Sequence, residues 1–278
     1  MKPFLKTKDF SISGEEFDLL YDEALEMLVT RPQPKNASIY YKSDAYISHT
    51  DANTSFVDKI YQVIKKYSLG KKVDLMTRQT KGHKTLLDIG AGTGDFLLAS
   101  EKRGWATNGV EPNYDARMRA GEKGVALMPS IESLPGEKYS VITLWHVLEH
   151  LPDLENKILK IIRHLEEEGS LIIAVPNFKS KDAEYYKEFW AAYDVPRHLW
   201  HFSQNAIEKL FAKHNLRLVE TKPMIFDAFY VSLLSEKYKS GKSGFPILLK
   251  SFFRGLWSNI SAWRTKEYSS IIYILKKG

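Results

Sequence analysis

The sequence contains no cysteine, which excludes disulfide bonds, a thiol nucleophile and a cysteine-bound zinc ion. It has no run of about 18 apolar residues, the length that a membrane-spanning helix needs. The N-terminal segment MKPFLKTKDF has neither an apolar core nor a small-residue cleavage site, so no secretory signal is predicted. These absences predict a cytoplasmic protein.

Acidic residues are scarce in the last part of the chain. From Lys222 onward there are ten Lys or Arg residues and three Asp or Glu residues, whereas residues 1–221 hold thirty basic and thirty-one acidic residues. The net charge of +6 is therefore a property of the C-terminal segment. No basic stripe with interleaved aromatic residues crosses the middle of the chain, so nucleic acid is not an expected partner.

The segment LLDIGAGTGDF, residues 86–96, combines a short apolar run with three alternating glycines. This pattern predicts a buried strand, a tight turn and the start of a helix. Glycines in such a turn let a ligand approach the backbone closely, and the N–H groups at the helix start are available to it. The segment therefore predicts a site for a nucleotide-like ligand.

Two acidic residues bear on which ligand binds. A dinucleotide-binding turn has the pattern G-x-G-x-x-G, which would put glycine at position 95, but this chain has Asp95 there. An extra carboxylate disfavours a pyrophosphate, whereas a ligand with an ammonium and a sulfonium group accepts it. Glu111 lies 23 positions after Asp88, at the end of the next predicted strand, where it can accept both hydroxyls of a ribose. Glu111 fits either cofactor, and Asp95 favours the cationic one.

Strand-like and helix-like segments alternate after residue 82, which predicts a parallel sheet covered on both faces by helices, with the ligand at the carboxyl ends of the central strands. The predicted strands are residues 84–90, 106–112, 125–130, 139–146, 170–177, 216–224 and 269–277. The predicted helices include residues 51–68, 95–102 and 154–165. A basic, glycine-containing loop is expected between the first of these helices and the first strand.

Five segments, in their order along the chain, resemble the class I S-adenosylmethionine-dependent methyltransferases: DIGAGTGDF, GVEPN, PSIESLP, SVITLWHVLEHLPD and IIAVPN. The resemblance covers roughly residues 82–224. It implies an α/β fold, a Rossmann-like, doubly wound seven-stranded sheet with an antiparallel last strand, and S-adenosylmethionine as cofactor with S-adenosylhomocysteine as product. AAYDVPRHLWHFS, residues 191–203, and the segment at 28–50 resemble the branch that holds ubiquinone-type O-methyltransferases and uncharacterised bacterial relatives.

The resemblance places cofactor-binding residues after four of the strands. They are Asp88, Gly90, Ala91, Gly92, Gly94, Asp95 and Phe96 in the glycine turn, Glu111 and Pro112 on the ribose, Ser130 and Ile131 beside the adenine, and Leu144, Trp145 and His146 after the fourth strand. Tyr40, Tyr41, Tyr46 and His49 are expected to form a lid over the cofactor, with plain packing of an N-terminal arm as an equal alternative.

The candidate catalytic residues are His201, His198, Arg197 and His146. Arginine can hold a carboxylate or phosphate of an acceptor, and a histidine can take the acceptor proton. The alternative is a structural loop pinned by Trp200 and Phe202, with both neighbouring histidines bonded to backbone. Glu149 and His150 are expected to organise a turn and cap the next helix. Metal-using relatives rely on clustered carboxylates that this sequence lacks, so no metal is expected.

The predicted domains are an N-terminal arm and helical lid at 1–81, a cofactor-binding core at 82–224, a helical cap insertion at 225–268 and the last core strand at 269–278. In residues 247–263, large apolar side chains recur at helical spacing opposite Lys250 and Arg254. The insertion is expected to wall an acceptor pocket. Peripheral membrane contact through this basic aromatic helix is the alternative.

Together these features predict an S-adenosylmethionine-dependent methyltransferase that O-methylates a small or amphiphilic metabolite, such as a quinone precursor, lipid or glycan intermediate. A non-catalytic methyltransferase-like binding module and an NAD-dependent oxidoreductase are the two alternatives. Retention of Asp88, the three glycines and Glu111 disfavours a chain that has lost cofactor binding.

Overall fold

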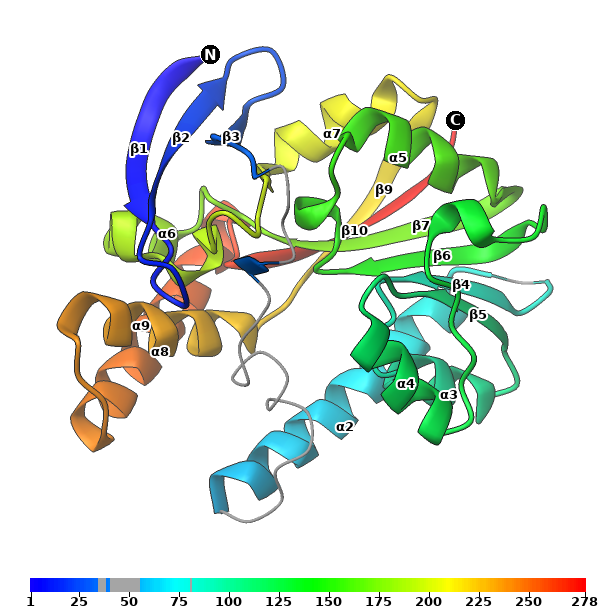
Figure 1. The fold of residues 1–278 in the computed structure, drawn as a ribbon, viewed down its shortest axis with the longest axis horizontal. Helices are drawn as coiled ribbons and strands as arrows, with labels where there is room; N and C mark the ends of the chain where they lie inside the picture. The colour runs from blue at the N-terminus through cyan, green and yellow to red at the C-terminus, as the bar shows by residue number, and fades with distance from the viewer. Residues whose placement is uncertain (35–38, 41–55, 81) are drawn as a thin grey trace. The chain divides into compact units, whose positions relative to one another are not determined.

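The computed structural model describes residues 1–34, 39–40, 56–80 and 82–278 (Figure 1). Its contacts divide the chain into two compact units. The first unit comprises residues 1–43, 148–152 and 174–273, and the second comprises residues 44–147, 153–173 and 274–278. The predicted limits of arm, core, cap and last strand stay a prediction.

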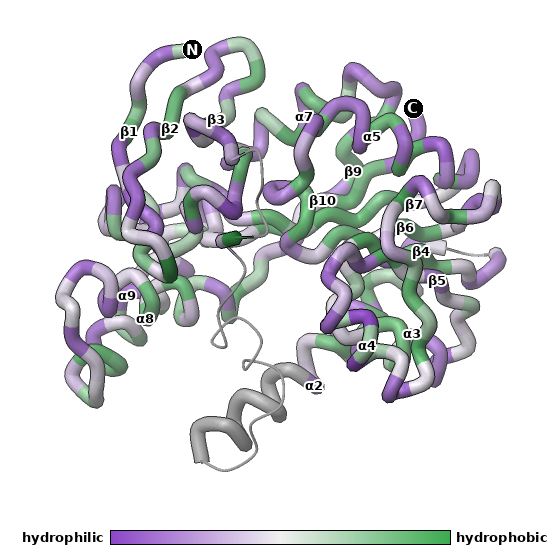
Figure 2. The backbone as a smooth tube through the Cα atoms, in the orientation of Figure 1, coloured by the Kyte–Doolittle hydropathy of each residue, from purple (hydrophilic) through white to green (hydrophobic). Residues whose placement is uncertain are grey.

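The larger sheet has six strands in the order β5-β4-β6-β7-β10-β9. Their bounds are β4 Thr85–Ile89, β5 Ala106–Val110, β6 Tyr139–Trp145, β7 Leu165–Pro176, β9 Leu216–Pro223 and β10 Ser270–Lys277. β4 runs parallel to both of its neighbours, β5 and β6. Figure 2 shows hydrophobic residues along β6, β7 and β10, as expected for strands that are covered on both faces.

The last strand runs against its neighbour, as predicted. Just beyond the end of β7, the Asn177 N–H donates to the Ser269 carbonyl at the start of β10, with 2.8 Å between N and O. At the other end, the Lys277 ammonium donates to the Leu165 carbonyl at 3.2 Å. The end of each strand thus lies beside the start of the other, so β7 and β10 are antiparallel. The α/β fold class is confirmed.

The sheet has one strand fewer than predicted among the described residues. The segment at 125–130 makes only an isolated parallel bridge between Val110 and Met128. Pro129 follows directly and has no N–H to continue the ladder. The chain then enters a short 3-10 helix, η2 Ile131–Ser133, so the pairing ends after one bridge.

The helices of the second unit are α2 Phe56–Thr77, α3 Asp95–Glu101, α4 Tyr114–Glu122 and α5 Leu154–Arg163. In Figure 1, α3 and α4 lie on one side of β4, β5 and β6, and α5 lies on the other. α2 continues as far as Thr77, through the first part of the basic segment that the sequence predicts as a loop. Val73 and Met76 on this continuation are fully buried, and their burial outweighs the helix cost of Gly70.

The first unit begins with a four-stranded sheet in the order β1-β2-β3-β8, paired antiparallel. The strands are β1 Lys2–Lys8, β2 Glu16–Asp22, β3 Met27–Arg31 and β8 Trp200–His201. Its other elements are η3 Leu148–His150, α6 Lys181–Tyr186, η4 Lys187–Phe189, η5 Ala191–Tyr193, α7 Gln204–Ala212, α8 Asp227–Ser240 and α9 Phe245–Thr265. The predicted C-terminal helical insertion is thus a pair of helices, α8 and α9.

Candidate functional site

In the second unit, Glu111 connects two strand ends. β4 and β5 are parallel, so the glycine turn after β4 and the residue after β5 meet at the same edge. The Gly92 N–H donates to Oε2 of Glu111 at 2.9 Å, and the Asn113 N–H donates to Oε1 at 2.8 Å. These bonds fix the carboxylate, and a carboxylate oxygen can accept more than one hydrogen bond. The geometry suits recognition of paired hydroxyls.

The glycine turn depends on the absence of side chains. Gly90, Gly92 and Gly94 have φ values of 75°, 55° and 77°, in the left-handed region. A Cβ on Gly90 would lie 2.3 Å from Cγ2 of Val147, whereas a Cβ on Gly92 would meet no atom within 4 Å. The turn is therefore tightly packed at its first glycine and open at its second.

Asp88 at the end of β4 is a buried carboxyl group, 3% exposed. Its Oδ1 accepts a hydrogen bond from the Thr143 hydroxyl at 2.6 Å. Burial, with a smaller contribution from the charge of Glu111, raises the pKa of Asp88 to about 7, although Thr143 and Lys72 act in the opposite direction. Near neutral pH this group is poised between its two protonation states.

Lys72 of α2 lies beside the predicted cofactor residues and is absent from the residues that the sequence predicts for the site. Its ammonium lies 4.3 Å from the ring centroid of Trp145, just at the end of β6. Phe96 packs its ring edge-on against the same indole, with 5.6 Å between the ring centroids. Lys72 lies in the segment that the sequence predicts as a loop. No helical pattern in that segment therefore indicated that Lys72 lies beside the strand ends.

Asp95 has a cationic partner in its own unit. Its Oδ1 lies 2.7 Å from the Lys123 ammonium, which also donates to the Thr93 hydroxyl at 3.0 Å. The ion pair offsets the charge of Asp95. The electrostatic reason for expecting a cationic ligand beside this residue is therefore weaker than the sequence suggested.

The other predicted cofactor residues occupy the same three strand ends or η2. Ala91, Ile131 and Leu144 are buried, Pro112 is exposed, and the Ser130 hydroxyl lies 3.0 Å from that of Ser133. His146 follows β6 with a φ of 57°, a backbone conformation uncommon for a residue with a side chain. Tyr41, Tyr46 and His49 lie outside the described residues, so their part in a lid stays a prediction. Tyr40 is buried in the first unit, where its hydroxyl donates to Oε2 of Glu15 at 2.6 Å, as the packing alternative expects.

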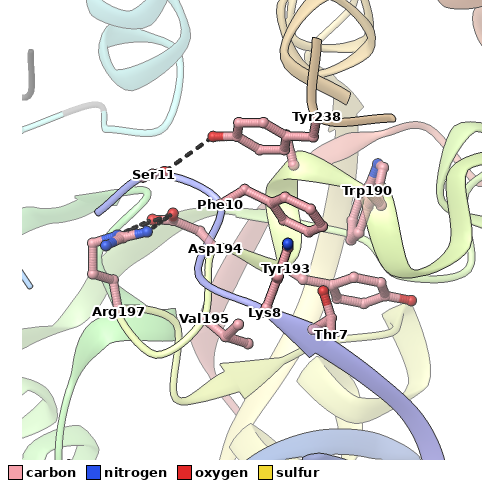
Figure 3. Close-up of a pocket in the computed structure, with 11 residues that line it drawn as sticks. Thr7, Lys8, Phe10, Ser11, Trp190, Tyr193, Asp194, Val195, Arg197 and Tyr238 are labelled. Carbon is pink, nitrogen blue, oxygen red and sulfur yellow. Dashed lines mark hydrogen bonds and ion pairs between the residues drawn. The ribbon is translucent and has the colours of Figure 1, made fainter. Parts of the chain in front are cut away.

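In the first unit, Arg197 is engaged by two carboxylates, those of Asp9 and Asp194. Figure 3 shows its contact with Asp194. Nη2 of Arg197 lies 2.8 Å from Oδ1 of Asp9 and 2.7 Å from Oδ1 of Asp194. Nη1 donates to the Tyr40 carbonyl at 3.1 Å. Although burial works against it, hydrogen bonding from Arg197 helps to hold the pKa of Asp9 below its usual value. These contacts favour the structural alternative for Arg197 over the anchoring of an acceptor anion.

The neighbouring histidines are also held by their own unit. Nδ1 of His198 lies 2.9 Å from the Ala192 carbonyl, and Nδ1 of His150 lies 3.0 Å from the Arg197 carbonyl. A carbonyl oxygen only accepts, so each neutral ring carries its proton on Nδ1. Nε2 of His201 lies 3.0 Å from the Thr30 hydroxyl, and burial lowers its pKa well below the usual value. Burial likewise lowers the pKa of His150 to about 4.

The sequence predicts that Glu149 and His150 cap α5, and this prediction is wrong. The N-cap of α5 is Asp153, which makes no capping hydrogen bond with its side chain. Instead, the Glu149 carbonyl accepts a hydrogen bond from the Leu199 N–H at 2.8 Å. Glu149 and His150 therefore organise the turn by holding the segment around Arg197.

One group of side chains in the described part of the chain brings together three possible metal ligands. A carboxylate oxygen of Glu149 and one ring nitrogen each of His150 and His198 lie within 4.8 Å of one another. Nδ1 of each ring bonds to a carbonyl, and Nε2 of His198 lies 3.9 Å from Oδ2 of Asp194. The prediction that no metal binds stays a prediction.

The family model of a methyltransferase domain matches residues 61–221, more than half of the chain. The chain belongs to the methyltransferase domain family. The matched range contains the glycine turn, Glu111 and His146. Family membership supports S-adenosylmethionine, predicted from the sequence, as the cofactor.

Two relatives of this methyltransferase domain are ubiquinone biosynthesis O-methyltransferases. The protein from Rickettsia prowazekii is 26% identical over 157 residues, which are 51% of this chain and 62% of the relative. The protein from Pseudomonas paraeruginosa is 30% identical over 109 residues, which are 35% of this chain and 47% of the relative. The match thus spans about half to three fifths of these proteins.

A solved structure shows the same fold. Magnesium protoporphyrin IX methyltransferase from Synechocystis, crystallised with S-adenosylhomocysteine, has a TM-score of 0.57 at 15% identity. The alignment covers 87% of this chain and 100% of that structure. The cyclopropane synthase MmaA2 from Mycobacterium tuberculosis aligns with a TM-score of 0.51, also at 15% identity, over 74% of this chain and 83% of that one. These likenesses confirm the Rossmann-like α/β fold.

Proposed function

We propose that this chain transfers the methyl group of S-adenosylmethionine to a hydroxyl oxygen of a small or amphiphilic acceptor, with a quinone precursor as the leading class. The observation that carries the proposal is the Glu111 carboxylate, which is fixed by the Gly92 N–H beside an open glycine turn. The names of the curated relatives support oxygen as the acceptor atom. A lipid or glycan intermediate is the second acceptor class.

The residues of the second unit fit this cofactor. Glu111 would hold the ribose hydroxyls, and the glycine turn would border the amino-acid part. Asp88 and Glu111 place two carboxyl groups at the strand ends against the single ammonium of Lys72, which favours a ligand with positive charge once Asp88 is ionised. Ile131 is buried in η2, where it would flank the adenine, and Trp145 and Leu144 would close the site beside β6.

The cofactor, when bound, supplies a methyl group that is already activated by its sulfonium. The protein then contributes alignment, exclusion of water and removal of the acceptor proton. We propose His146 as the proton acceptor, because it follows β6 in the same unit as the cofactor residues and histidine titrates near neutral pH. Arg197, His198 and His201, by contrast, are proposed to hold the 191–203 segment in shape.

The decisive experiment is incubation of the full chain with methyl-labelled S-adenosylmethionine and a series of hydroxylated benzoates, catechols and hydroquinones. Label in a methyl ether of one series member is the expected result. Label only on a ring carbon of these acceptors would contradict O-methylation, and binding of the cofactor without transfer to any acceptor would favour the binding-module alternative.

Glu111→Ala is expected to weaken binding of S-adenosylmethionine at least about tenfold. The variant removes the carboxylate that accepts the ribose hydroxyls, and a hydrogen bond to a charged group contributes roughly 1.5–3 kcal/mol. Titration calorimetry measures the change, with the exposed Glu122 of α4 changed to Ala as the matched control. Unchanged affinity in a folded Glu111 variant would mean that the ribose lies elsewhere.

The affinity for S-adenosylmethionine is also expected to fall as pH drops below about 7. The pKa of Asp88 in the free protein is about 7, and a cation bound nearby favours the carboxylate form. Binding then releases a proton below this pH, so affinity falls by up to about tenfold per pH unit. Calorimetry in two buffers of different ionisation enthalpy counts the proton, and Asp88→Asn should abolish the release. No proton release from the unsubstituted chain at pH 6 would refute the coupling.

A further inference from the structure

α9 is a helix with its small side chains inside and its large apolar side chains outside. The buried residues are Ser251, Gly255, Ser258, Asn259 and Ala262. The exposed large apolar residues are Phe245, Leu248, Leu249, Phe252, Phe253, Leu256, Trp257, Ile260 and Trp263, and we call them the aromatic face of α9. Phe253 is 57% exposed and Trp263 is 66% exposed. A surface helix ordinarily buries such a stripe, so this orientation calls for a partner.

Close packing against α8 fixes this orientation. A Cβ on Gly255 would lie 2.9 Å from Cα of Phe229 and 3.0 Å from the Ala228 carbonyl oxygen, so the two backbones approach as near as a glycine permits. The Asn259 amide donates to the Ile225 carbonyl at 3.0 Å, and the Ser258 hydroxyl donates to Asp182 at 2.7 Å. Turning α9 to bury its aromatic face would break these contacts.

Basic residues lie near both ends of α9. Residues 237–266 contain seven Lys or Arg residues and no Asp or Glu residue. Three of the seven are engaged within the unit: Lys250 pairs with the buried Glu236, and Arg254 and Lys239 lie over the ring of Tyr185. The other four are Lys237, Lys242, Arg264 and Lys266. These four are exposed and make no ion pair with another described residue.

We propose that the aromatic face of α9 docks on an anionic membrane surface, with its flanking basic residues on the lipid headgroups. Phe and Trp side chains insert at the headgroup boundary, and Lys and Arg are drawn to anionic lipids. No helix of the described residues is long and apolar enough to cross a bilayer, so the contact is at the surface. The proposal is independent of the acceptor proposed above.

The charges of the other possible occupants argue against them. A second copy docked through the same face would bring two sets of basic residues together. The second unit of this chain holds 19 basic and 17 acidic residues, so it offers no negative excess to match the basic ends of α9. An anionic lipid surface complements both the apolar and the charged parts of the face.

The experiment is co-sedimentation of the full chain with vesicles of equal parts phosphatidylglycerol and phosphatidylcholine, compared with phosphatidylcholine alone. We expect binding to the anionic vesicles that weakens as salt is added. The double variant Lys242→Glu with Arg264→Glu should lower the partition coefficient at least about tenfold, since each basic residue at such a surface contributes about fivefold. Phe253→Ser with Trp263→Ser should lower it by a similar factor, because both side chains lose their insertion.

Matched controls come from exposed residues of the second unit. Lys102→Glu with Arg163→Glu makes the same charge change, and Met118→Ser with Leu159→Ser makes the same kind of apolar change. Both controls should bind vesicles like the unsubstituted chain, and circular dichroism should show all four variants folded. Equal losses in the controls, or no binding by the unsubstituted chain, would overturn the proposal.

Hydroxyl-radical footprinting distinguishes a membrane from the two other possible partners of the aromatic face, a second copy of the chain and the chain's own acceptor pocket. Phe253 and Trp263 should react without vesicles and be protected with anionic vesicles. Protection without vesicles would overturn the proposal. In that case a dimer that dissociates in the Phe253 and Trp263 variant would assign the face to a second copy, and a monomer would assign it to a cap over the chain's own acceptor pocket.

Discussion

Arg197→Met is expected to lower the free energy of unfolding by about 3–5 kcal/mol, because it leaves the buried carboxylate of Asp9 without its cationic partner. The side chains of Arg197 and Asp9 are 2% and 0% exposed, with 2.8 Å between Nη2 and Oδ1. Asp194 shares the same guanidinium. Chemical denaturation followed by circular dichroism measures the change, and the exposed Arg217 of β9 changed to Met is the control, expected within about 0.5 kcal/mol of the unsubstituted chain.

A second variant distinguishes a structural from an acceptor-binding role. Asp9→Asn with Arg197→Met removes both charges of the pair and should recover part of the lost stability. If Arg197 instead binds the acceptor, the single variant would keep its stability and raise the KM for the acceptor. A stable Arg197→Met chain would therefore contradict the role that its contacts indicate.

The meeting of the glycine turn with Glu111 was predictable because its parts are local. The glycine turn lies in one short segment, and Glu111 lies at the end of the next strand, so alternating strands and helices alone place both at one sheet edge. The partners of Arg197 were not predictable in this way. Asp9 is 188 positions away in the chain, and nothing in either local sequence indicates that the two meet.

Contacts between residues far apart in the chain also explain two predictions that were wrong in the second unit, those on the charge of Asp95 and on the loop that contains Lys72. The ion pair between Asp95 and Lys123 joins residues 28 positions apart, on different elements, so the sequence shows the acid without its neutralising partner. Lys72 was hidden because Gly70 and nearby lysines read as a loop, whereas tertiary burial of Val73 and Met76 keeps the segment helical. In both cases a distant contact overrode the local pattern.

The small sheet of the first unit also depends on pairing between strands that are far apart in the sequence. β3 pairs with β8, and the register joins Leu28 to His201 and Val29 to Trp200. β8 has only two residues, which is too short for a strand to be recognised from the sequence. This pairing is what sets the histidines of the 191–203 segment inside the unit, next to Thr30.

Gly90→Ala is expected to lower the free energy of unfolding by about 2–4 kcal/mol and to abolish cofactor binding. A φ of 75° costs a residue with a side chain about 1 kcal/mol, and the new methyl group, 2.3 Å from Cγ2 of Val147, adds overpacking of about 1–3 kcal/mol. Gly104→Ala is the matched control, because its φ is 79° but a Cβ there meets no atom within 4 Å. It should lose only the backbone cost.

The clash and the backbone cost are separable in a double-mutant cycle. Adding Val147→Ala to Gly90→Ala removes the methyl groups that the new side chain meets, so the double variant should be more stable than the sum of the two single effects predicts. The coupling should be at least about 1 kcal/mol, measured by urea denaturation. Additive effects would mean that the turn moves away from Val147 without cost. In that case the requirement for glycine at position 90 would not come from the contact with Val147.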